Sequence, residues 1–256
     1  FFEYPEDIRL YGVSFQTSVA GASVGGEISY RPNMPMQINT GDMSRTALQL
    51  GADNTHRDYA DVAPGTYIPG YQRKEFWQAQ VSVIQFFDRV LGASRLALVG
   101  EAGVNYISGL GDVKFGRDSL FGQSPFVDGD TGLGALPAGQ CSSNEGTAAG
   151  RSPNAASWCE NDGFYTSWSS GYRIRASLDY SNVIAGINLS PNVSWSHDVE
   201  GYGPNFTEDA KAISVGVNAD YGNKYNASIS YTDFFDGKYN TAVDRDFASV
   251  SFSVSF

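Results

Sequence analysis

Long hydrophobic runs are missing from this sequence. Its 256 residues have a mean hydropathy of −0.27, and no uninterrupted apolar run is longer than a few residues. A transmembrane helix needs about 20 consecutive apolar residues, so a helical membrane span is excluded. A β-strand that crosses a membrane spreads its apolar residues over alternate positions, and low mean hydropathy therefore leaves a membrane-spanning sheet open.

Basic residues and histidines are also scarce. Lys and Arg number 17 against 28 Asp and Glu, which gives a net charge of −11 and a pI of about 4.5. Such a chain lacks a basic stripe for phosphates, so nucleic acid is not an expected partner. Hydrolytic enzymes need a nucleophile in contact with a base. The histidines are His56, in a loop, and His197, which we interpret with Asp198 as a solvated pair. We predict no enzymatic activity, cofactor or metal.

Cysteine is limited to two residues. Cys141 and Cys159 lie 18 positions apart in one stretch rich in Gly, Ser and Asn. They are either two unpaired loop thiols or a disulfide. A disulfide is the interpretation that suits a loop at the cell surface, provided that the protein lies in the cell envelope.

The end of the chain alternates strictly between two kinds of residue. From Ala248 onward every even position is apolar and every odd one is serine. A period of two predicts a strand with one apolar and one polar face. An edge strand of a soluble β-sandwich could show this pattern. An alternating last strand that ends in an aromatic residue is, however, typical of the assembly signal of outer-membrane β-barrels, here Val250, Phe252, Val254 and Phe256.

Nine alternating segments are predicted in the whole chain: residues 8–19, 23–30, 76–87, 96–106, 172–180, 185–195, 213–221, 225–232 and 248–256. Every second connection between them is a tight turn, and the others are longer, with long loops at about 39–74 and 107–162. Outer-membrane barrels have short periplasmic turns and long external loops. The sequence therefore predicts an all-β fold, an antiparallel transmembrane β-barrel, with both long loops outside the cell.

Aromatic residues gather at the ends of the apolar face, where a membrane interface would lie. Ordinary β-propensity also favours Tyr and Trp in strands, but it does not explain their gathering at strand ends. The predicted outer girdle is Tyr11, Trp77, Tyr106, Tyr172, Trp195 and Tyr231, and the predicted periplasmic girdle is Tyr180, Tyr221 and Tyr225.

The opposite face carries Ser, Asn, Gln and Gly together with charged residues. A dry sandwich core could not hold so many polar groups. We therefore predict a lumen lined by Glu27, Glu101, Arg173, Arg175 and Asp179. The two arginines either neutralise carboxylates such as Glu101 or provide a positive field for an anionic or amphipathic solute.

Several stretches, taken in order, resemble one known family. They are Gly26-Glu27-Ile28-Ser29-Tyr30-Arg31-Pro32-Asn33, Leu98-Val99-Gly100-Glu101, Gly171-Tyr172-Arg173-Ile174-Arg175, Asn188-Leu189-Ser190-Pro191, Ser196-His197-Asp198-Val199 and Asp244-Arg245-Asp246-Phe247. Together they resemble the C-terminal half of the domain-of-unknown-function 1302 family of Gram-negative outer-membrane proteins. Family members are longer, which implies that residues 1–256 are the C-terminal portion of one larger barrel. The chain also opens without methionine, and nine strands conflict with the even number expected of a bacterial barrel.

The resemblance implies an outer-membrane channel or transporter component that moves hydrophobic or amphipathic small molecules or lipids together with an envelope export system. Expected partners are outer-membrane lipid and lipopolysaccharide, the barrel assembly machinery, and a periplasmic or inner-membrane transporter. The alternatives are a structural or adhesive surface barrel and an outer-membrane hydrolase. No catalytic residue is carried over from the family.

Overall fold

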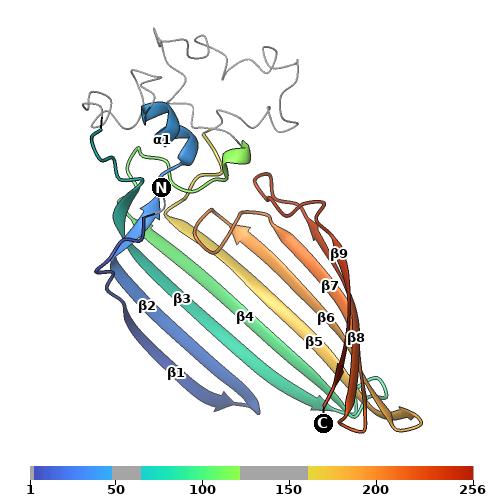
Figure 1. The fold of residues 1–256 in the computed structure, drawn as a ribbon. Helices are drawn as coiled ribbons and strands as arrows, with labels where there is room; N and C mark the ends of the chain where they lie inside the picture. Colours follow the sequence, from blue (N-terminus) through green and yellow to red (C-terminus); the bar gives the residue numbers. More distant parts are fainter. Residues whose placement is uncertain (1–2, 48–64, 122–160, 256) are drawn as a thin grey trace, which may run out of the picture.

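The computed structural model describes residues 3–47, 65–121 and 161–255, and it forms one antiparallel sheet of nine strands (Figure 1). Each strand pairs with the next one in the sequence. The strands are β1 (Tyr11–Val19), β2 (Ala22–Gln37), β3 (Tyr71–Asp88), β4 (Arg95–Ser108), β5 (Trp168–Ile184), β6 (Ile187–Glu200), β7 (Lys211–Tyr221), β8 (Tyr225–Phe235) and β9 (Phe247–Val254). One short helix, α1 (Thr40–Ala47), and a 3₁₀ turn (Ser119–Phe121) lie in the connections.

The predicted all-β fold with nine antiparallel strands is confirmed. The alternation of connections is confirmed as well, because the turns at 20–21, 89–94, 185–186 and 222–224 lie at one end and the longer connections at the other (Figure 1). We call these the turn end and the loop end. No helix in the described part of the chain is long and apolar enough to cross a membrane.

Several predicted boundaries were wrong. Strand β2 continues to Gln37 and β3 already begins at Tyr71, so both extend into regions that were predicted as loop or left unassigned. A register shift between Arg31 and Met34 interrupts this ladder, and such a bulge breaks the period of two that the prediction relied on. A tight turn was expected between the predicted segments 172–180 and 185–195, at residues 181–183. These residues instead lie within β5, at a register shift between Tyr180 and Ile184, and the chain reverses at 185–186.

Helix α1 was not predicted, although its start carries a recognisable signal. Asn39 precedes the helix, and its side-chain oxygen accepts a hydrogen bond from the backbone N–H of Asp42 (3.1 Å). Asparagine is a preferred N-cap residue, and an acidic residue in the first turn favours the helix dipole. The cap was not recognised because it lies in the polar stretch at about 39–74, which was predicted as a loop.

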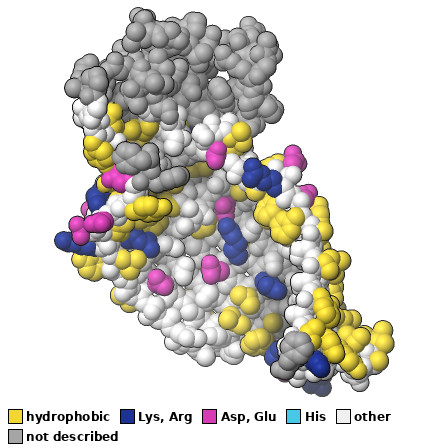
Figure 2. Space-filling view, viewed as in Figure 1, with side chains coloured by type: hydrophobic (Ala, Val, Ile, Leu, Met, Phe, Trp, Pro, Cys, Tyr) yellow, Lys and Arg dark blue, Asp and Glu magenta, His cyan; other side chains and the backbone are white. Residues whose placement is uncertain are grey.

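The two faces of the sheet differ sharply in chemistry. The outer face carries apolar side chains that remain exposed, for example Val13 (77%), Ile229 (58%) and Val250 (79%). The inner face is hollowed and consists mostly of polar side chains and backbone, with charged residues among them (Figure 2). This inverts the arrangement of a soluble sheet, in which the apolar face is the one that is covered.

Aromatic side chains form a continuous row on the outer face, close to the loop end. Tyr11, Tyr30, Trp77, Tyr106 and Trp168 are cross-strand partners on five successive strands. The rings of Tyr30 and Trp77 stack with centroids 4.1 Å apart, and those of Tyr106 and Trp168 lie 4.6 Å apart. The sequence prediction had placed three of these five residues in one girdle. Tyr30 and Trp168 complete the row.

The best-buried apolar cluster among the described residues lies at the loop end and not along the sheet. Met36, Ile38, Phe76, Ile107 and Phe115 are each at most 2% exposed and pack together. We call this cluster the loop-end cap. A second cluster of Phe121, Tyr202 and Tyr239 adjoins it through Tyr165. The described parts of the longer connections are thus packed onto the strand ends and onto one another.

The carboxylate of Asp246 joins the end of the β8–β9 connection to β8. Asp246 accepts hydrogen bonds from the backbone N–H of Phe234 (3.1 Å) and from the hydroxyl of Tyr231 (3.0 Å). These bonds favour the ionised form and hold the pKa of Asp246 below its usual value.

This arrangement predicts a pH effect. Because the folded-state pKa of Asp246 lies below the unfolded one, the stabilisation is present above the unfolded pKa of about 4 and is lost as the pH falls through the folded value. Hydrogen exchange in residues 233–247, corrected for the intrinsic rate, should therefore increase below about pH 4. Asp246→Asn should show faster exchange at neutral pH and little further change. An equal acid response in the variant would contradict the assignment to Asp246.

Candidate functional site

Charged side chains gather on the inner face where β4, β5 and β6 run side by side (Figure 2). Glu101 on β4 lies directly opposite Arg173 on β5, and Arg175 follows two positions later on the same face. Asp198 extends from β6 towards the same place. The period of two puts these side chains together.

Arg173 and Asp198 form an ion pair that also anchors a loop. The Nη2 of Arg173 lies 2.6 Å from Oδ1 of Asp198, and Oδ2 of Asp198 accepts a hydrogen bond from the backbone N–H of Thr207 (2.8 Å). Asp198 is only 7% exposed. The interpretation of His197 and Asp198 as a solvated pair was wrong, because Asp198 is buried and serves Arg173 and Thr207.

One predicted role of Arg173 was to neutralise a nearby carboxylate such as Glu101. Arg173 does pair with a carboxylate, but its partner is Asp198 and not Glu101. Within the described ranges, Glu101 and Arg175 make no ion pair or side-chain hydrogen bond. Both side chains are exposed on the inner face. Asp198 satisfies Arg173, and this leaves one carboxylate and one guanidinium open to a solute.

Residues 201–210, which connect β6 to β7, fold inward over the sheet, and we call them the inner loop. The ring of Phe206 rests on Gly103 and Gly171 of neighbouring strands. A Cβ atom added to Gly171 would lie 2.8 Å from this ring and 2.9 Å from the carbonyl oxygen of His197. Only glycine therefore leaves room for Phe206 at this position.

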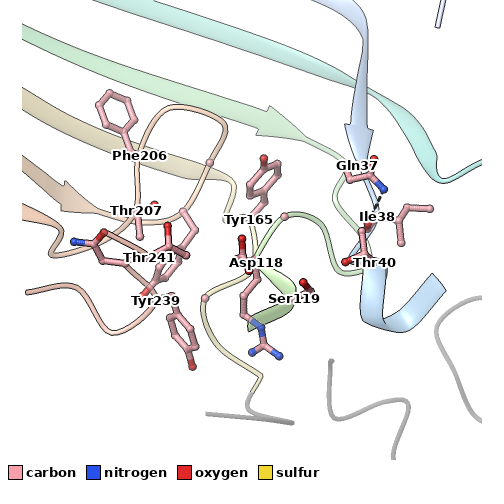
Figure 3. A pocket seen from close by; sticks show the side chains of 16 residues that line it. Gln37, Ile38, Thr40, Asp118, Ser119, Tyr165, Phe206, Thr207, Tyr239 and Thr241 are labelled. Carbon is pink, nitrogen blue, oxygen red and sulfur yellow. Dashed lines mark hydrogen bonds between the residues drawn. The ribbon is translucent and has the colours of Figure 1, made fainter. Parts of the chain in front are cut away.

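Three hollows follow one another along the inner face. The upper one is a cavity of about 500 Å³ at the loop end, and Figure 3 shows Tyr165, Phe206 and Tyr239 around it. The middle one, of about 200 Å³, is lined by Phe206, Asn105, Glu101 and Arg173 among others. The lower one, of about 380 Å³, shares Glu101 and Arg173 with it and adds Arg175. Phe206 is the side chain common to the upper and middle hollows.

The upper hollow combines aromatic faces with hydrogen-bonding groups. Burial raises the pKa of Tyr165, and burial together with nearby carboxylates raises the pKa of Tyr202. Both phenols therefore remain protonated near neutral pH and can donate hydrogen bonds. The guanidinium of Arg117 lies 3.8 Å from the ring centroid of Phe164 and donates a hydrogen bond to the carbonyl of Asp162 (2.8 Å). This fixes a cation in the cavity wall.

The family was identified by comparison with known proteins. Residues 1–256, the whole chain, match the family model described as "Protein of unknown function (DUF1302)". The chain belongs to the DUF1302 family. The resemblance seen in the sequence motifs is thereby confirmed. No curated protein and no solved structure matches the chain.

The other predicted lining residues of this DUF1302 chain lie on the same face but apart from the β4–β6 group. Glu27 on β2 is exposed and lies opposite Gln80 of β3. Asp179 lies near the turn end, where its Oδ2 pairs with Arg95 at 2.7 Å. Its Oδ1 accepts a hydrogen bond from Ser190 (3.1 Å). The charge of Asp179 is therefore paired with Arg95 and is not available to a solute.

The predicted girdle and signal residues of the DUF1302 chain have defined surroundings. At the loop end, Trp195 donates a hydrogen bond to the hydroxyl of Tyr172 (3.2 Å). At the turn end, the Tyr180 hydroxyl donates to the carbonyl of Leu91 (3.1 Å), and the rings of Tyr221 and Tyr225 stack at 6.3 Å. Among the signal residues, Val250 and Phe252 are exposed and Val254 is half-buried. Cys141, Cys159 and Phe256 lie outside the described residues, so the disulfide stays a prediction.

One motif of hydrolases was missed in the sequence. Gly21-Ala22-Ser23-Val24-Gly25 matches the Gly-x-Ser-x-Gly pattern, which marks a nucleophile on a strand-to-helix turn. In this DUF1302 chain Ser23 instead follows a β-hairpin turn, and its hydroxyl accepts a hydrogen bond from Gln16 (3.4 Å). His197 lies four strands away on β6. Among the described residues, the match therefore has no catalytic geometry around it. In the part of the chain that the structure describes, no three His, Cys, Asp or Glu residues are grouped to hold a metal.

Proposed function

We propose that this chain forms part of an antiparallel β-barrel in the bacterial outer membrane, and that the barrel carries hydrophobic or amphipathic small molecules or lipids. The single observation that carries this proposal is the inversion of the sheet, with exposed apolar residues outside and a polar, charged hollow inside. A soluble protein rarely exposes an apolar surface of this extent, whereas lipid would cover it.

The free edges of the sheet support closure into a barrel. Within the described residues, strands β1 and β9 are each paired on one side only, so each has a row of backbone groups without strand partners. Hydrocarbon offers no hydrogen bonds to such groups, and membrane-spanning sheets avoid the cost by closing. We propose that further strands connect β9 back to β1. The aromatic row at the loop end and the Tyr221–Tyr225 pair at the turn end would then lie near the two membrane interfaces.

The inner face favours transport over a purely structural role. Glu101 and Arg175 remain open to solutes, and hollows line the inner face beside them. A structural barrel would be expected to pair its internal charges and pack its interior. On this proposal the turn end faces the periplasm, where a periplasmic or inner-membrane export partner would deliver the solute.

An adhesive or structural surface barrel is the second candidate. The loop-end cap favours it, because buried contacts hold the ends of the long connections in a fixed shape that a partner could recognise. Such a protein would need no open charge on its inner face.

The test of transport is the ion selectivity of the full-length protein in planar bilayers. Arg175→Gln removes an open positive charge, so we expect an assembled channel with a shift of selectivity towards cations. Arg95→Gln is the matched control, because Arg95 already pairs with Asp179 near the turn end, and it should change selectivity less. Wild-type protein that assembles but gives neither conductance nor solute uptake would overturn transport and favour the surface role.

A further inference from the structure

The inner loop divides the hollows of the inner face into two compartments. Phe206 lines both the upper and the middle hollow, while Glu101 and Arg173 line both the middle and the lower hollow. Phe206 therefore lies between the cavity at the loop end and the β4–β6 charges on the inner face.

The position of this ring is built into the fold. Gly103 on β4 and Gly171 on β5 have no side chain, and this leaves room for the ring on the sheet. The loop is held down beside these glycines, since Thr207 donates its backbone N–H to Asp198, and Asp198 pairs with Arg173. The backbone N–H of Asp209 also donates to the carbonyl of Asp198 (2.9 Å). The neighbouring Asn205 reaches the buried Asn105 across the middle hollow (3.4 Å).

The groups on either side of Phe206 define the chemistry of a matching solute. Above it, the half-buried ring of Tyr165 and the buried rings of Tyr202 and Tyr239 line the upper hollow. The phenols of Tyr165 and Tyr202 stay protonated near neutral pH and can donate hydrogen bonds. Below it are Glu101 and Arg175, which have no partner within the described ranges. Aromatic faces suit a flat apolar group, and the polar groups suit an end that forms hydrogen bonds.

We propose that Phe206 is a specificity-determining residue on a path along the inner face, and that the path takes amphipathic molecules with a flat apolar group and a hydrogen-bonding end. This inference rests on the proposed transport function. The ring of Phe206 narrows the path for hydrated ions. An amphipathic molecule can pass because its flat apolar group stacks on the ring.

Current block by 1-naphthol in planar bilayers of the full-length protein tests the proposal. In the wild type, 1-naphthol should block the ionic current, whereas sorbitol, which forms hydrogen bonds but has no flat apolar group, should not. Phe206→Ala should raise the ionic conductance and weaken the 1-naphthol block about fivefold, the size expected for losing one aromatic contact. Phe206→Trp should retain the block.

Two further variants separate this role from a structural one. Phe206→Leu keeps an apolar side chain but has no ring face, so it should assemble and still lose most of the block. Phe234→Ala removes another phenylalanine of the inner face, one that lines none of the three hollows and stacks on Phe247, and it should leave the block unchanged.

The outcomes distinguish this inference from the proposed function. A wild type that conducts ions, with an unchanged block in Phe206→Ala and Phe206→Leu, would overturn the role of Phe206 and leave transport standing. A wild type that assembles but neither conducts ions nor takes up solute would overturn transport and this inference with it.

Discussion

Ile229→Arg is expected to abolish most of the assembled protein, whereas Ser230→Arg is expected to be tolerated. The two residues are neighbours in the middle of β8, and they point to opposite faces. Ile229 lies in an apolar row with Val217 and Val250 on the outer face. An arginine on the lipid side near the membrane midplane costs about 2–4 kcal/mol. At 1.4 kcal/mol per factor of ten, this cost lowers the equilibrium constant for membrane insertion by roughly 30-fold to 700-fold.

The comparison is measured by heat-modifiable migration on gels and by the amount of protein in outer-membrane fractions. Ser230→Arg introduces the same side chain one position away, so it controls for size, charge and expression. Equal loss in both variants would show that β8 tolerates no arginine at all. Normal assembly of Ile229→Arg would contradict the proposal that the outer face meets lipid.

Gly201→Ala is expected to detach the inner loop, and the outcome can be separated from an ordinary backbone effect. Gly201 has φ +72°, and an added Cβ would lie 2.1 Å from the carbonyl oxygen of Trp168. The left-handed backbone costs about 1–2 kcal/mol for an alanine. Overpacking adds about 1–3 kcal/mol, because the atom in the way belongs to the backbone of β5 and cannot rotate aside.

Gly222→Ala is the matched control for this substitution. Gly222 has a similar φ of +62°, but nothing lies within 4 Å of its added Cβ. Gly222→Ala should therefore lose only the stability that the left-handed backbone costs an alanine, about 1–2 kcal/mol. Hydrogen exchange and limited proteolysis across residues 201–210 should reveal strong loss of protection in Gly201→Ala and none in Gly222→Ala. Retained protection in Gly201→Ala would mean that the loop is not held at Trp168.

The sequence was most informative where one simple period governs the structure. Alternation predicted the faces of the regular part of each strand, so the five predicted lining residues fall on one side of the sheet. It failed where the period breaks. Residues 31–37 contain a bulge and two prolines, and residues 40–47 form a capped helical turn inside a polar stretch.

Partners of the site residues were harder to predict than their faces. The sequence suggested Glu101 as a partner of Arg173, because their strands were expected to pair, and the two are indeed opposite each other. Arg173 pairs with Asp198 instead. Asp198 lies on β6, the other neighbour of β5, and it also accepts a hydrogen bond from Thr207. The position of the inner loop depends on the contacts of Phe206 with Gly171 and Gly103, which lie about 35 and 100 residues away in the chain. Only the folded structure brings these together.

The loop-end cap bears on how the strands find their register. A slip of one residue turns every side chain to the wrong face and is strongly disfavoured, but a slip of two residues keeps the alternation intact. The repetitive serine and valine rows of the later strands offer little to distinguish the two states. A two-residue slip does, however, move a strand by about 7 Å. Phe76 and Ile107, which are cross-strand partners, would then no longer meet Ile38 and Phe115. The cap can close only on β2, β3 and β4 in their native alignment, so its buried contacts favour that register over a two-residue slip.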